Sequence, residues 1–115
     1  MSLDREPADI ARDAAEAIRA LQQRTLDVCF DEPTAIHRTC DELRQAVQST
    51  PQALIHIWMD LQTMEVRLDN GTDGRDAKEQ VRQALNTAHD SLTQAGEAME
   101  RATQLLSHMR GLGNG

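Results

Sequence analysis

The chain has 115 residues and a mass of 12.8 kDa, which is the size of one domain. Only 39% of its residues are hydrophobic, with one Phe and one Trp, so any core must be modest and aliphatic. The net charge of −7 argues against nucleic acid and anionic membranes as partners. We expect neither a membrane span nor a signal peptide, and therefore a cytoplasmic location.

Three prolines and one loop with two glycines divide the chain into four predicted helices. Each proline precedes an amphipathic stretch and suits the first turn of a helix, because the missing N–H breaks no hydrogen bond there. The predicted helices cover residues 7–26, 33–48, 51–68 and 77–109 of a single domain, 1–115. We expect the small, polar tail 111–115 to be disordered.

The first three predicted helices each carry an apolar stripe. In the first, the inward positions are Ile10, Ala14, Ile18, Leu21 and Thr25. In the second, they are Ile36, Cys40, Leu43 and Val47. Thr50 suits the N-cap of the third helix. One stripe of that helix is Leu54, Ile57, Trp58, Leu61, Met64 and Leu68, and a second is Ile55, Met59 and Val66. A helix that is apolar on two faces is either the most buried one or carries a second interface.

The last predicted helix has an unbroken 4-3 repeat of apolar residues, which is typical of a helix–helix contact line. The repeat comprises Val81, Leu85, Ala88, Leu92, Ala95, Met99, Ala102, Leu106 and Met109. Large residues alternate mostly with Ala, and Gly96 lies beside the Ala row, so we expect a close approach of a neighbouring helix.

Helix length then predicts an interface. At about 1.5 Å per residue, the last helix spans roughly 50 Å and each of the others roughly 25–30 Å. Its far half therefore needs either the first helix or a second chain to cover it. We expect a homodimer, with seven apolar contact candidates: Ile55, Met59, Val66, Met99, Leu105, Leu106 and Met109. Burial inside one monomer is the alternative for each of them.

Metal-binding patterns in the sequence are incomplete, and we predict no metal or cofactor. His37 and Cys40 have part of a zinc spacing without a second matching pair. The loop 69–74 resembles a calcium loop, but Gly71 and Gln80 stand where two ligands are required. We expect Cys29 and Cys40 to be reduced and buried rather than joined in a disulfide.

Catalytic motifs are likewise not recognised, and we predict no enzyme activity. Asp90-Ser91-Leu92 matches the attachment tripeptide of acyl carrier proteins but falls within a helix, where that family has its serine at a helix start. Trp58 at mid-chain is similar to the WXG family of small secreted helical hairpins. Here Asp60 replaces the motif's Gly, and the chain has no Tyr for the family's C-terminal signal.

A broader resemblance rests on ARDAAEAIRALQQRTL, STPQALIHIWMDL and VRQALNTAHDSLTQAGEAMERATQLL. These stretches resemble small all-helical proteins of high-GC Gram-positive bacteria, for which no activity is established. The sequence therefore predicts an all-α fold, an antiparallel four-helix bundle with a long C-terminal helix. Its predicted function is a non-catalytic interaction or assembly module. The alternatives are a secreted WXG-like effector and a helical enzyme with an unrecognised site.

Overall fold

The computed structural model describes residues 5–110 and is all-helical, as predicted. The helices are α1 (Pro7–Asp27), α2 (Pro33–Thr63) and α3 (Arg75–Leu106). The chain divides into two compact units, one up to Glu32 and one from Pro33 onward. The tail 111–115, expected to be disordered, lies outside the described residues.

The first unit contains α1, which has the predicted start at Pro7 and ends one residue later than predicted. Glu6 is its N-cap residue, and the Asp9 carboxylate pairs with Arg12 at 2.8 Å. Taken by itself, the helix buries no residue, and Ile10 and Ile18 are 52% and 43% exposed. Its apolar stripe thus forms no core within its own unit.

The predicted four-helix bundle is wrong, because the described chain forms three helices and α2 runs straight through Pro51. Thr50 does not cap a new helix. Its hydroxyl donates to the Ala46 carbonyl at 2.7 Å, and the Ser49 hydroxyl donates to the Gln45 carbonyl at 2.8 Å. Both hydroxyls therefore bond back into the preceding turn, which is a pattern of a helix interior.

The continuity of α2 follows from a repeat that crosses the proline. Two rows of residues recur every seven positions: Cys40, Val47, Leu54 and Leu61, and His37, Arg44, Pro51 and Trp58. Pro51 is buried, and every other member of the two rows is half-buried. A break at Pro51 would put the two halves out of phase, so packing against one neighbour favours a single helix over the local cost of proline.

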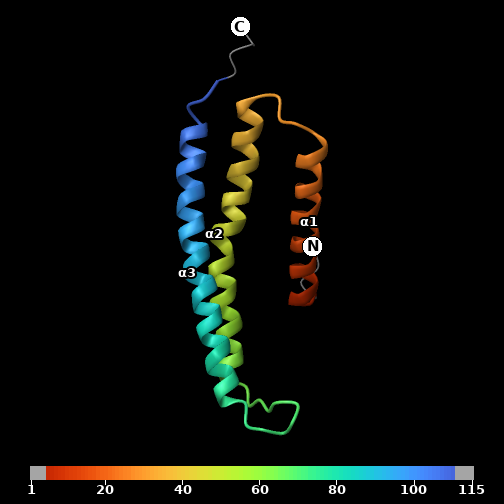
Figure 1. Ribbon diagram of the computed structural model, residues 1–115, viewed down its shortest axis with the longest axis vertical. Coiled ribbons are helices and arrows are strands. Elements are labelled where there is room, and N and C mark those ends of the chain that lie inside the picture. The colour runs from red at the N-terminus through yellow and green to blue at the C-terminus, as the bar shows by residue number, and fades with distance from the viewer. Residues whose placement is uncertain (1–4, 111–115) are drawn as a thin grey trace. The chain divides into compact units, whose positions relative to one another are not determined.

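That neighbour is α3, which lies antiparallel beside α2 (Figure 1). It begins two residues before the predicted start and ends three residues before the predicted end. The contact positions of α3 are half-buried or buried: Arg82, Leu85, His89, Leu92, Gly96, Met99, Thr103 and Leu106. The large residues of the predicted repeat are among them.

The predicted alternation of these large residues with Ala is only partly right. Ala88 is half-buried, but Val81, Ala95 and Ala102 are exposed. The buried residues are instead those one position later, such as Gly96 and Thr103. The large residues of α3 can share a contact line either with the row that starts at Val81 or with the row that starts at Arg82. The sequence alone favoured the row of Val81, because that row is the more apolar.

The connection between α2 and α3 is longer than predicted, because α2 ends at Thr63 rather than near residue 68. Val66 and Gly74 are joined by a backbone hydrogen bond of 3.0 Å. A Cβ on Gly74 would lie 2.5 Å from Val66 Cγ2 and 2.7 Å from the Val66 carbonyl oxygen, so glycine is required for this close approach. Gly71 has φ +84°, a left-handed conformation that glycine adopts at little cost.

Lys78, the only lysine of the chain, ties α3 to the end of α2. Its Nζ donates to the carbonyls of Gln62 and Met64 at 3.2 and 2.5 Å. Carbonyls at a helix C-terminus have no partner within the helix, and they carry the negative end of the helix dipole. The Lys78 ammonium group gives these carbonyls hydrogen-bond donors and places a positive charge at the negative end of the dipole.

Replacement of Pro51 tests the continuity of α2. In a helix interior, Pro51→Ala restores a backbone hydrogen bond and gains about 3 kcal/mol in helix propensity, while it loses about 1.6 kcal/mol of ring burial. We expect the free energy of unfolding in urea to rise by about 1 kcal/mol. Pro33→Ala, at the true first turn of α2, should change it by less than about 0.5 kcal/mol. A loss of stability from Pro51→Ala, with a weaker helical circular dichroism signal, would contradict one continuous helix.

Candidate interaction face

The α2–α3 hairpin has two faces that flank its line of contact. Helices of an antiparallel pair are related by an approximate two-fold axis perpendicular to their common plane, so equivalent positions on the two helices share a face. On each helix, the positions directly before the contact row of His37 or Arg82 lie on one flank. The positions directly after the contact row of Cys40 or Leu85 lie on the opposite flank. The two flanks differ in chemistry.

One flank, here called the apolar face, consists of two rows with a seven-residue spacing. The α2 row is Ile36, Leu43, Thr50 and Ile57, and the α3 row is Val81, Ala88, Ala95 and Ala102. Seven of these eight residues are apolar, and none is charged. Ile57 is 56% exposed and Val81 is 40% exposed, so the hairpin leaves this face largely uncovered.

The opposite flank, here called the polar face, has the reverse composition. Its α2 row is Asp41, Gln48, Ile55 and Gln62, and its α3 row is Glu79, Asn86, Thr93, Glu100 and Ser107. Eight of these nine residues are polar or charged. A solvated polar flank is the ordinary condition of a helix surface, so it is the apolar face that requires an explanation.

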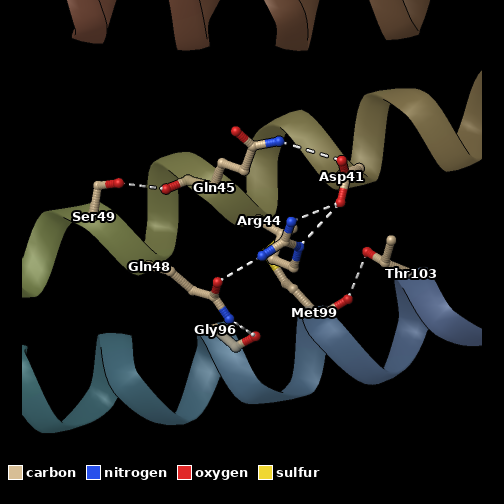
Figure 2. A network of polar contacts seen from close by, with 8 residues as sticks. All are labelled: Asp41, Arg44, Gln45, Gln48, Ser49, Gly96, Met99 and Thr103. Carbon is tan, nitrogen blue, oxygen red and sulfur yellow. Dashed lines mark hydrogen bonds and ion pairs between the residues drawn. The ribbon is translucent and has the colours of Figure 1, made fainter.

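A side-chain network joins Asp41 and Gln48 of the polar face to the contact line between α2 and α3 (Figure 2). Arg44 Nη2 and Nε donate to Asp41 Oδ1 at 2.8 and 3.1 Å, and Arg44 Nη1 donates to Gln48 Oε1 at 2.7 Å. Gln48 Nε2 then donates to the Gly96 carbonyl at 3.2 Å and so connects α2 with α3. The network fixes the positions of these side chains relative to one another.

Three carboxylates of the hairpin have pKa values lowered by neighbouring donors. Arg44 lowers the pKa of Asp41 chiefly by its side-chain hydrogen bonds. The Arg75 backbone N–H lowers the pKa of Asp73, and the Arg82 side chain lowers the pKa of Glu79. Each of these groups is held in its charged form, which is a structural role and not that of a proton donor at neutral pH.

The seven predicted contact residues fall in different places. Met99 and Leu106 occupy contact positions toward α2 and are half-buried, and Val66 is half-buried beside Gly74. Ile55 and Met59 form a small apolar patch on the polar face and are 38% and 54% exposed. Leu105 and Met109 are 64% and 50% exposed near the end of α3. The sequence did not single out Leu43 and Ile57 of α2, or the Ala row of α3, as one surface.

The candidate metal ligands do not come together. No group of three or more His, Cys, Asp and Glu side chains within residues 5–110 has a geometry for holding a metal ion. Both cysteines are free, and Cys40 is half-buried, but the expected burial of Cys29 is wrong because that residue is exposed. Glu97 and Glu100 form a Glu-x-x-Glu pair on α3, and both are exposed.

A hollow beside the connecting loop has a volume of about 820 Å³. Two of the charged residues that line it are bonded to the chain. Lys78 donates to the carbonyls of Gln62 and Met64, and Asp73 accepts from both the backbone and the side chain of Arg75.

Comparison of the chain with known protein families, with curated proteins and with solved structures finds no match. The resemblance to helical proteins of high-GC Gram-positive bacteria consequently stays a prediction. The function has to be argued from the hairpin itself.

Acid titration tests the Asp41 network. The lowered pKa means that the ionised Asp41 stabilises the fold above its unfolded-state pKa, and that this stabilisation is lost as the pH falls through the folded-state value. We expect Asp41→Asn to reduce the urea midpoint at pH 7, with the difference from wild type shrinking below about pH 4. The adjacent, exposed Glu42→Gln is the control. An Asp41→Asn deficit that persists unchanged to pH 2.5 would contradict this ionic role.

A double-mutant cycle tests the close approach at Gly96. A Cβ at this position would lie 2.8 Å from Gln48 Cγ, so Gly96→Ala must displace Gln48 and break its bond to the Gly96 carbonyl. We expect a net loss of about 1 kcal/mol in unfolding free energy. In a Gln48→Ala background the same change should gain about 0.5–1 kcal/mol, because only helix propensity remains. The same sign in both backgrounds would show that Gln48 does not set the limit.

Proposed function

We propose that this protein is a non-catalytic helical interaction and assembly module that binds a helical partner through the apolar face of its α2–α3 hairpin. The location we propose is the cytoplasm, and self-association is the form of assembly that we favour. Among residues 5–110, no helix is long and apolar enough to cross a membrane.

The observation that carries the proposal is the contrast between the two flanks of one hairpin. Both flanks belong to the same two helices and have the same seven-residue spacing, yet one is polar in eight of nine positions and the other apolar in seven of eight. Composition alone would make the two flanks similar. The contrast therefore indicates selection for a dry surface on one side.

The burial pattern supports the same proposal. Within the described residues, no hydrophobic side chain is fully buried. A two-helix hairpin buries only the line between its helices, and such small units usually need further helices or another chain for stability. Covering the apolar face would supply the missing burial at roughly 25 cal/mol per Å².

Site-specific photocrosslinking in the producing cell tests this function. A photoreactive residue in place of Ile57 should give one discrete crosslinked product, because Ile57 is the most exposed large side chain of the α2 row. The same residue in place of His56, exposed on the side of the same helix that is opposite α3, is the matched control. A product at position 56 but not at 57, or none at either, would overturn the proposal.

A further inference from the structure

We propose that the occupant of the apolar face is a second copy of this chain, with α2 of each copy packed antiparallel against α3 of the other. This inference rests on the proposed function, since it names the partner for the same face. The product is an all-antiparallel arrangement of four helices made from two hairpins.

The sizes of the side chains in the two rows support a second copy. The α2 row carries the large residues Ile36, Leu43 and Ile57, whereas the α3 row carries Ala88, Ala95 and Ala102. Gln48 lies level with Gly96 in the hairpin, so Leu43 and Ile57 lie near the levels of Ala102 and Ala88. Large side chains of α2 and small side chains of α3 at these shared levels are complementary, and one chain carries both.

The symmetry of the dimer follows from this pairing. A two-fold axis parallel to the helices places α2 of one copy over α3 of the other, so that the large Leu43 and Ile57 meet the small Ala102 and Ala88. A two-fold axis across the helices would instead place Ile against Ile and Ala against Ala. That arrangement leaves a gap along the Ala rows and crowds the α2 rows, which is costly in a packed interface. The side-chain sizes in the two rows therefore favour the two-fold axis that is parallel to the helices.

Charge supports the same partner. The chain has a net charge of −7, so two copies repel each other unless they meet where charge is absent. The eight residues of the apolar face are uncharged. The residues just outside them are uncharged and small, with the exception of Asp60 beside Ile57: Thr39, Ala46, Ala53, Ala77, Ala84, Ser91 and Ala98. Because Asp60 is the one charged residue in this set, two copies can meet here with little direct repulsion.

The area of the face is sufficient for a dimer. Rows of 21 residues span roughly 31 Å, and two helices side by side are roughly 19 Å wide. The face therefore covers roughly 600 Å² per copy and roughly 1,200 Å² for a pair, which is the lower end of stable interfaces. The dimer we expect is accordingly one that dissociates on dilution.

Sedimentation equilibrium of the full chain tests this inference, with Ala95→Glu as the disrupting variant and Thr93→Glu as its control. Both positions are exposed on α3, two residues apart, and both changes add one negative charge. Wild type and Thr93→Glu should reach twice the 12.8 kDa chain mass. Ala95→Glu should weaken association by roughly 100-fold or more, because its carboxylate has no partner in the interface. Ala102→Glu is the second variant, and circular dichroism must show unchanged helix content for both.

The other outcomes separate this inference from the proposed function. A wild-type monomer that gives a crosslink to a different protein at Ile57 overturns the second copy and leaves the interaction module standing. A wild-type monomer in which Ala95→Glu raises hydrogen exchange within α1 shows that α1 of the same chain is the occupant, and overturns both. A dimer equally weakened by Thr93→Glu and Ala95→Glu, or by neither, overturns the assigned face.

Discussion

The contact between α2 and α3 is the constraint on which the rest of the described hairpin depends. Each helix presents a continuous seven-residue repeat, and the two repeats keep α2 continuous through Pro51, at a position where local propensity favours a break. Close approach then requires Gly96 beside Gln48, and the loop end requires Gly74 beside Val66. Lys78 fixes the same end by binding the terminal carbonyls of α2. Every one of these local features makes sense only in the presence of the second helix.

That dependence explains how much of the fold the sequence could predict. The helical class, the starts at Pro7 and Pro33 and the large residues of the α3 repeat follow from composition and periodicity, which are local properties. The interruption at Pro51 was wrongly predicted, because a proline is read locally as a helix start while its burial against α3 is a tertiary effect. The spacing of Cys40 and Leu54 was the sequence signal for one continuous helix. They are fourteen residues apart, and four turns of a packed helix place them on the same side.

The candidate site was predicted less well than the fold, for a related reason. A list of apolar residues on single helices gathered Met99 and Leu106, which turn toward α2, with Leu105, which is 64% exposed. It left out Ile57 and the Ala row, because alanine alone is too common in helices to indicate an interface. Which residues share a face depends on how two helices are paired, and that pairing becomes visible only when the contact rows on both are known. The small residues of α3 then indicate an interface, because they lie on the same flank as a row of large residues of α2.

The contrast between flanks also bears on why the polar network lies where it does. Arg44 and Gln48 bring charge and amide groups to the edge of the contact between α2 and α3, which a purely apolar contact would not need. Buried or partly buried polar groups fix the register and orientation of paired helices, because only one arrangement satisfies their hydrogen bonds. A hairpin whose register is fixed from the polar face keeps its two apolar rows at constant relative height. Rows held in this way can act as one surface, so the network on one flank sets the geometry that the other flank presents to the partner we propose.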